Sequence, residues 1–419
     1  MIRFRLSREA LLPGLFLLAS IIGFTGIFPG IAELVGAGDQ SVRAATFAGL
    51  WAIAYGSALL LLPFAQHRFI PASLIALGLG CYVLISTTWV QHDNVRLDLA
   101  FAFVSTILVA HLCASNFDPV RLLHIIRALI GSWCLVGIAM YAAGVETASF
   151  LDGAGRGNIL GGDPFKGLFS HKVDAGMYAS IGFSLFLADR SRRWHTAFAF
   201  VCLAAVVLSA SASAILISVF SIVLVVVLRI GRRLEKRLGI VIFLFGGLFL
   251  LINLGLGSQL LLDLVGRDAS LTGRTGIWAA GAELIVERPI LGWGYFGLFD
   301  GNGAGPFFAH YYARYYVPVH LQSSYLQIMA ELGILGFFLF LWLATVAVKK
   351  AIGGVLKNET GYLGIFILLS IVMFYGLAEN VFIGNSIGLF AISFVAFLPR
   401  GMSVEKTRQS MSTGRNLGW

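Results

Sequence analysis

Residues 195–230 read HTAFAFVCLAAVVLSASASAILISVFSIVLVVVLRI. A helix crosses the hydrocarbon core of a bilayer with about 17–25 residues, so this apolar run is too long for a single crossing. The small polar cluster Ser209-Ala-Ser-Ala-Ser213 interrupts it near its middle. The pattern therefore predicts two membrane helices joined by a tight turn at this cluster.

The composition of the whole chain agrees with a membrane protein. Its 419 residues are 58% hydrophobic and 12% charged, whereas soluble domains are about 45–50% apolar and about 25% charged. So few charges cannot cover a water-facing surface, and the same numbers exclude disordered and disulfide-scaffold classes. The net charge of +9 does not indicate a nucleic-acid partner, because cytoplasmic loops of membrane proteins collect Lys and Arg.

The apolar runs predict an all-α polytopic protein with about twelve transmembrane helices. The last run is divided at Glu379-Asn380, because a carboxylate and an amide are costly in lipid. The predicted spans are residues 10–30, 43–64, 70–90, 97–114, 122–143, 174–188, 195–209, 211–229, 238–257, 322–347, 361–378 and 383–399.

The charge distribution sets the orientation of these spans. Most of the 30 Lys and Arg residues fall on the side that carries the N-terminus, which the positive-inside rule assigns to the cytoplasm. Both termini are therefore expected to be cytoplasmic, with a retained first helix instead of a signal peptide. The predicted regions are helices one to nine (1–257), an outer loop with short amphipathic helices (258–321), helices ten to twelve (322–399) and a cytoplasmic tail (400–419).

The outer loop 258–321 is rich in aromatic residues and contains two arginines at helical spacing. Arg274 and Arg288 flank a short amphipathic helix that should end before Pro289. A helix over this stretch would place them about 20 Å apart, so they can bind one diphosphate only if its ends fold inward. Guanidinium groups suit phosphate because they stay charged and donate in pairs. Contacts with lipid headgroups or nearby carboxylates are the alternative.

Titratable side chains occur at two predicted helix starts on the outer side. His320 precedes the span 322–347, and Glu331 lies about two turns inside that span. A histidine can take a proton from an attacking hydroxyl near neutral pH, and an intramembrane carboxylate is a functional candidate. His171, Lys172 and Asp174 cluster at the start of the span 174–188, where charges can also simply cap a helix.

The four cysteines do not indicate a metal site or a disulfide framework. They lie in apolar stretches without a paired spacing, which favours a role as small apolar residues. These residues are Cys81, Cys113, Cys134 and Cys202.

Three segments, taken in order, resemble the O-antigen ligase/polymerase superfamily and in particular its exopolysaccharide-polymerase branch. They are FKGLFSHK at 165–172, LTGRTGIW through RPILGWG at 271–294, and HLQSSYLQIMAELG at 320–333. The resemblance extends over about residues 120–399. The chain departs from the family pattern at Val173, where the family has Asn, at Gln322-Ser323, where it has His-Asn, and at Ala212, where an Arg is common.

The resemblance implies a GT-C-like fold with a large periplasmic loop between helices nine and ten, and a glycosyltransferase in the bacterial inner membrane. The reaction would be inverting and would need no metal or cofactor. Its donor would be an undecaprenyl-diphosphate-linked oligosaccharide and its acceptor a glycan hydroxyl. Three roles are expected: catalysis by His320 and Glu331, diphosphate binding by Arg274, Arg288, Lys172 and Arg314, and glycan binding by His171, Gln322, Tyr325, Trp278 and Trp293.

The sequence leaves several functions open. A polymerase of exopolysaccharide or O-antigen repeat units is the leading hypothesis, and a ligase that moves a finished glycan onto lipid A-core or another acceptor is the nearest rival. A polysaccharide transporter or flippase would need ionisable residues in mid-membrane, and few occur. A scaffold would leave Arg274 and Arg288 dispensable. The expected partners are the lipid bilayer, the lipid-linked oligosaccharide, the acceptor glycan and other polysaccharide assembly and export proteins.

Overall fold

The structure is a computed structural model. It describes residues 17–399 except 37–38, 66, 68–69, 93–94, 152–156, 159, 190–191, 231–273, 300–304, 312–317, 358 and 360. Within these ranges the regular elements are helices, and an isolated antiparallel bridge joins Ser149 to Phe165. By length and composition six of the described helices can cross a membrane, or seven if a bent pair near the start counts as one span.

The helix positions agree closely with the apolar runs. The long helices are α3 (Gln40–Leu61), α4 (Pro71–Ser86), α5 (Leu97–Asn116), α6 (Pro119–Ala142), α9 (Ala212–Ile230) and α14 (Ser324–Leu356). Shorter helices are α2 (Phe28–Val35), α7 (Lys172–Ala188), α8 (Arg193–Leu208), α12 (Arg274–Glu287), α13 (Phe307–His310), α15 (Tyr362–Ala378) and α16 (Ile387–Phe397). Single 3-10 turns occur at η1 (Leu62–Phe64), η2 (Thr87–Trp89) and η3 (Glu146–Ala148).

Both predicted interruptions of apolar runs are confirmed. The serine cluster separates α8 from α9, and Ala210 there has a positive φ of 51°. Helix α15 ends at Ala378, and Glu379 is extended. The run 10–30 is not one straight span, because helix Leu17–Phe24 meets α2 at 89°. The span 238–257 lies outside the described residues, so the total of twelve spans stays a prediction.

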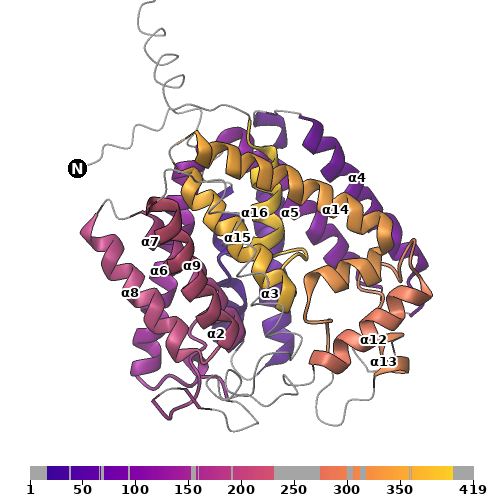
Figure 1. The fold of residues 1–419 in the computed structure, drawn as a ribbon. Helices are drawn as coiled ribbons and strands as arrows, with labels where there is room; N and C mark the ends of the chain where they lie inside the picture. The colour runs from indigo at the N-terminus through magenta and orange to yellow at the C-terminus, as the bar shows by residue number, and fades with distance from the viewer. Residues whose placement is uncertain are drawn as a thin grey trace, which may run out of the picture.

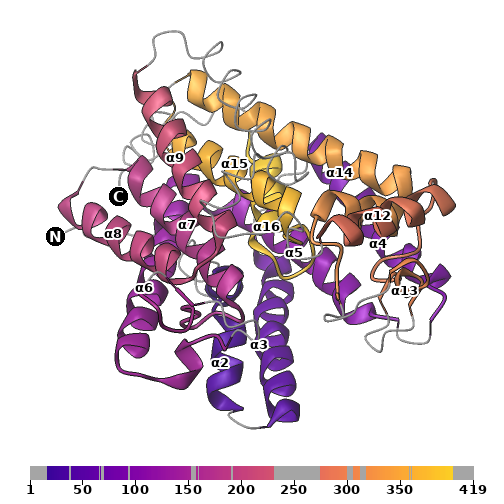
Figure 2. The same ribbon diagram turned by 60° about the horizontal axis from the view of Figure 1, so that its bottom comes forward.

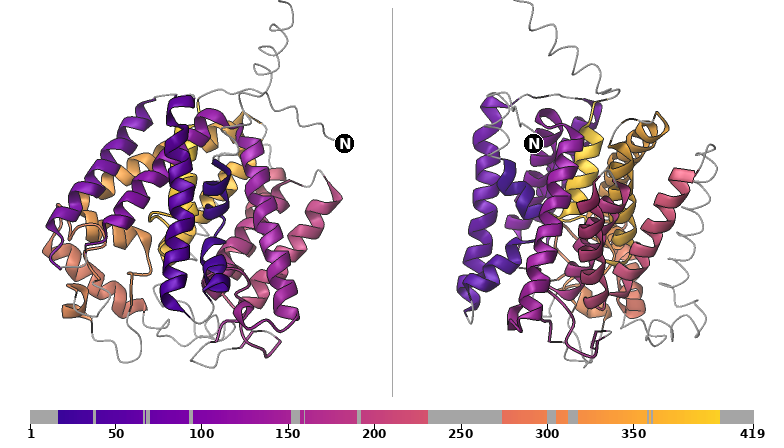
Figure 3. Two further views of the ribbon diagram at one scale, coloured as in Figure 1. Left: turned by 180° about the vertical axis from the view of Figure 1, so that it is seen from behind. Right: turned by 90° about the vertical axis from the view of Figure 1, so that its left-hand side faces the viewer.

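The described helices form one bundle in which α15 lies between two groups (Figure 1). Helix α7 packs on α6, α8, α9 and α15, whereas α14 packs on α4, α12, α15 and α16. In Figure 2, α12 and α13 lie beside the start of α14. Figure 3 shows α3 at the edge of the bundle, where it contacts α2 and α5. The starts of α12 and α14 and the end of α15 are thereby brought together.

A break in α14 is filled by the glycine-rich segment that follows α12. Gly333 has φ 61° and ψ −169°, which interrupts the helical hydrogen bonds inside α14. The freed backbone groups pair with residues 289–294: Trp293 N donates to Ala330 O (3.0 Å), and Ile334 N donates to Pro289 O (2.8 Å). A Cβ at Gly333 would lie 2.2 Å from Ile290 O, so only glycine fits. The pairing of these two motifs fixes α12 against α14.

Candidate functional site

Arg274 lies where the start of α12 meets the loop before α14 and the end of α15. Its Nε donates to Gln322 Oε1 at 2.9 Å, and its Nη2 donates to Glu379 Oε1 at 2.7 Å. The Arg274 and Glu379 side chains are 10% and 14% exposed. A guanidinium carries five N–H donors, and these contacts with described residues occupy two of them. Arg274 is thus held in one orientation while it keeps donors for an anionic ligand.

The loop before α14 is fixed by hydrogen bonds on both sides. Leu321 N donates to Gln327 Oε1 at 2.7 Å, and Trp278 Nε1 donates to Leu321 O at 3.1 Å. Gln322 has a positive φ of 50°, which turns its side chain toward Arg274. The predicted glycan-binding residues Trp278 and Gln322 therefore hold the loop in place.

His320 and His171 both use Nδ1 to accept a backbone hydrogen bond. Gln322 N donates to His320 Nδ1 at 3.1 Å. His171 is the N-cap of α7, and its Nδ1 accepts from Val173 N, also at 3.1 Å. Desolvation, together with the nearby Arg274 and His171, lowers the pKa of His320 to about 4. A neutral ring carries one N–H, so the proton of His320 lies on Nε2.

Glu331 lies at a buried position inside α14. Its side chain is 1% exposed, and its carboxylate accepts hydrogen bonds from the Gln327 amide and the Phe296 backbone N–H. Because Gln327 also binds Leu321 N, Glu331 supports the loop that carries His320. The catalytic role predicted for Glu331 stays a prediction.

Arg288 lies at the opposite end of α12 from Arg274. Its guanidinium stacks on the Trp293 ring, 4.0 Å from the ring centroid, and Trp293 Nε1 donates to Leu284 O at 2.9 Å. Helix α12 is continuous, so its two ends are separated by about 20 Å of helical rise. Helix α12 does not bend back on itself, as one diphosphate site shared by both arginines would require. This structure therefore does not bring Arg274 and Arg288 together.

Of the remaining predicted site residues, Lys172 and Tyr325 lie in the first turns of α7 and α14. Lys172 opens α7, and its Nζ lies 5.5 Å from the Phe150 ring centroid. Tyr325 donates its hydroxyl to Met373 O at 3.1 Å, which ties α14 to α15. Arg314 lies outside the described residues. In the described part of the chain, no group of three or more His, Cys, Asp or Glu side chains is arranged to hold a metal ion.

Glu379 is the site residue that the sequence analysis missed. In the sequence it marks only a polar interruption of an apolar run, at the point where the last spans divide. Its backbone is fixed by Ser324, whose hydroxyl donates to Glu379 O at 2.9 Å. A carboxylate at a membrane helix end was the available signal, but its pairing with Arg274, 105 positions earlier, is a tertiary contact without a local pattern.

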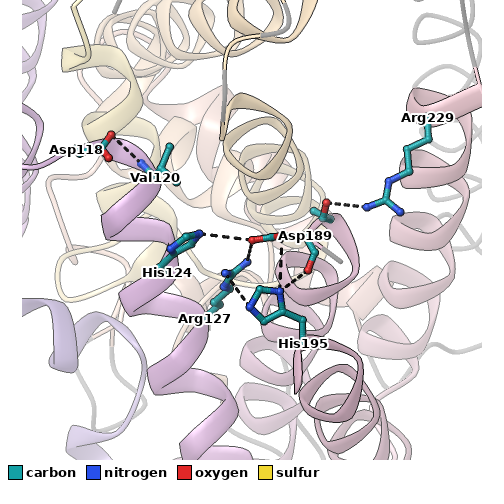
Figure 4. A network of polar contacts seen from close by, with 8 residues as sticks. Asp118, Val120, His124, Arg127, Asp189, His195 and Arg229 are labelled. Atoms are coloured by element: carbon teal, nitrogen blue, oxygen red, sulfur yellow. Dashed lines mark hydrogen bonds and ion pairs between the residues drawn. The ribbon is translucent and has the colours of Figure 1, made fainter. Parts of the chain in front are cut away.

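A second arginine cluster lies at the other end of α7 (Figure 4). Arg127 Nη1 donates to Asp189 Oδ2 at 2.6 Å, and Arg127 Nη2 lies 3.2 Å from His195 Nε2. His195 Nδ1 lies 2.7 Å from Asp189 O. Arg229 donates to the carbonyls of Leu187 and Ala188 at the end of α7. These contacts tie together the ends of α6, α7, α8 and α9.

Residues 197–341 match a protein family described as O-Antigen ligase. The chain is also similar to the exopolysaccharide production protein ExoQ of Rhizobium meliloti (strain 1021), with 26% identity over 294 residues. That alignment covers 66% of this chain and 64% of ExoQ, so the chain spans less than two thirds of its relative's length. The chain is therefore similar to O-antigen ligases over part of its length and to an exopolysaccharide production protein.

These similarities agree with the resemblance found in the sequence motifs and with a multi-pass membrane protein. The family match includes Arg274, Gln322 and His320. Glu379 and His171 lie outside the matched residues and join the site through the fold. The matched segment thus contains Arg274 and the loop before α14, whereas α7 and α15, which lie outside it, contribute His171 and Glu379.

Proposed function

We propose that this protein transfers a glycan from a polyprenyl-diphosphate donor to a hydroxyl group of an acceptor glycan. The observation that carries the proposal is the placement of Arg274, with unused donors, beside the His320 loop. Arginine binds phosphate oxygens in pairs. The donor is an undecaprenyl-diphosphate-linked oligosaccharide, and the reaction takes place at the periplasmic face of the bacterial inner membrane.

Electrostatic stabilisation of the leaving group is the main contribution of the site. As the anomeric C–O bond breaks, negative charge develops on the diphosphate, and a fixed guanidinium stabilises this charge without reorganising. Gln322 and Glu379 hold Arg274 in the required orientation. The Nε2–H of His320 supplies a neutral donor beside the arginine.

The polymerase reaction is the preferred form of this activity. The name of the relative refers to exopolysaccharide production, which supports polymerisation of lipid-linked repeat units. The family description refers to a ligase, which supports transfer of a finished glycan to lipid A-core or another acceptor. Deletion of a polymerase removes long chains, whereas deletion of a ligase leaves long chains on the lipid carrier.

The direct test uses the purified protein in lipid vesicles with an undecaprenyl-diphosphate oligosaccharide and excess EDTA. We expect a ladder of longer lipid-linked glycans and release of undecaprenyl diphosphate. A single transfer to an added acceptor, without a ladder, would assign the ligase reaction instead. If the vesicles consume no donor, whether the acceptor is a second lipid-linked oligosaccharide or the added acceptor, glycosyl transfer by this protein is contradicted.

A further inference from the structure

The two histidines near Arg274 are poorly arranged to accept a proton. A backbone N–H can only donate, so the ring nitrogen opposite it must accept. His320 and His171 each spend their Nδ1 lone pair in this way, on Gln322 N and Val173 N. The Nε2 atom of each neutral ring therefore carries the proton and has no lone pair available. The rings can donate to phosphate or glycan oxygens, but another group must take the proton of the acceptor hydroxyl.

Resting on the proposed glycosyl transfer, we propose that Glu379 is the general base. Its carboxylate contacts Arg274 Nη2 at 2.7 Å, so it lies next to the expected leaving group. Its backbone is fixed to the first residue of α14 by Ser324, which places the carboxylate on a rigid part of the fold. The Glu379 side chain is 14% exposed, so it is not fully enclosed by the described residues.

The helix ends distinguish Glu379 from the other nearby carboxylate, Asp174. Glu379 is the C-cap of α15, where the negative end of the helix dipole strengthens a base. Asp174 is in the first turn of α7, where the positive end of the helix dipole favours the ionised carboxylate, whereas burial raises its pKa. Asp174 also accepts a hydrogen bond from Ser170. The direct contact with Arg274 is what favours Glu379.

Arg274 couples the base to the donor. Without donor, the cation stabilises the Glu379 carboxylate and makes it a weak base. A bound diphosphate neutralises the arginine, so Glu379 binds a proton more readily when the leaving group is in place. The acceptor oxygen then forms the new bond to the anomeric carbon, the C–O bond to phosphate breaks with its electron pair on the diphosphate, and the hydroxyl proton moves to Glu379. Release of that proton to water restores the carboxylate.

The test compares Glu379→Gln, His320→Gln and the matched control Glu283→Gln in vesicles containing the full-length protein. Glutamine at 379 can still accept the hydrogen bond of Arg274, so donor Kd should change less than about threefold while kcat falls at least about 100-fold. Glutamine at 320 keeps an N–H donor and should retain measurable transfer. Glu283 lies on the exposed side of α12, paired with His310, and its substitution should leave kcat unchanged.

Chemical rescue separates a base from a structural role. In Glu379→Ala, added formate should restore part of kcat, because a small carboxylate can occupy the vacated space. Wild-type kcat in Glu379→Gln, or loss of transfer in His320→Gln alone, would overturn the assignment of Glu379. Failure of formate to restore Glu379→Ala, in a folded protein that binds donor, would also overturn it. A wild-type protein that binds donor but forms no product would instead overturn the proposed function itself.

Discussion

The two arginine clusters of this protein have nearly the same ion-pair geometry but different surroundings. Arg274 contacts Glu379 at 2.7 Å, and Arg127 contacts Asp189 at 2.6 Å. The Arg127 cluster joins the ends of consecutive helices, and its histidine is bound through both ring nitrogens. The Arg274 cluster joins a helix start, a loop and a distant helix end. A short ion pair is therefore common to both clusters. We propose from the contacts around it that the Arg274 cluster binds a ligand, whereas the Arg127 cluster supports the fold.

The largest expected effect is that of Arg274→Gln. Glutamine can still contact Gln322 or Glu379, but it lacks the charge that binds and stabilises the diphosphate. We expect kcat/KM for glycosyl transfer to fall at least about 100-fold, because a fixed donor at a developing charge contributes about 3–4 kcal/mol. Transfer assays at matched protein amounts measure this, with thermal unfolding in detergent as the control for folding. Activity within tenfold of wild type would remove Arg274 from the site.

A substitution in the Arg127 cluster should lower the stability of the fold and leave glycosyl transfer unchanged. Arg127→Met leaves Asp189 and His195 without their buried partner, and breaking a buried pair costs about 3–5 kcal/mol. The exposed fraction of the Asp189 side chain is 31%, so the lower end of this range is expected. Thermal unfolding should shift clearly downward, while kcat per folded molecule stays near wild type. A kcat loss larger than that of Arg274→Gln would reverse the roles assigned to the two clusters.

Sequence reasoning predicted the helices far better than the site. Apolar runs specify helices locally, so α7 and α12 and the break at Glu379 appear where expected. The bend between Leu17–Phe24 and α2 was not anticipated, since Gly26 at φ 82° is a small interruption within an apolar run. Arg274 and His320 were identified from motifs, but which residues surround them depends on packing. Spacing along α12 could not decide whether Arg288 joins Arg274, and the continuous helix separates them.

The variant Arg288→Ala tests whether the arginine at the far end of α12 also binds the donor. Arg288 stacks on Trp293 at the far end of the helix from Arg274, so its loss removes a partly exposed cation–π contact worth about 0.5–1 kcal/mol. We expect a small decrease in thermal stability and a kcat/KM within about fivefold of wild type. Parallel measurement of Arg274→Gln provides the reference. A loss of transfer as large as that of Arg274→Gln would support the prediction that both arginines bind the donor.

The smallest expected effect is the pH dependence contributed by His320. Its pKa is lowered to about 4 in the folded protein, from its ordinary value of 6.5, chiefly by desolvation and by Arg274. The unfolded chain therefore binds more protons between pH 6.5 and 4, so this residue destabilises the fold as the pH falls through that range and has no such effect above it. The variant His320→Gln lacks this contribution to the pH dependence of stability. The fall in melting temperature between pH 7.5 and pH 5 should be smaller in the variant than in wild type, and equal falls would mean that the ring is not held neutral beside Arg274.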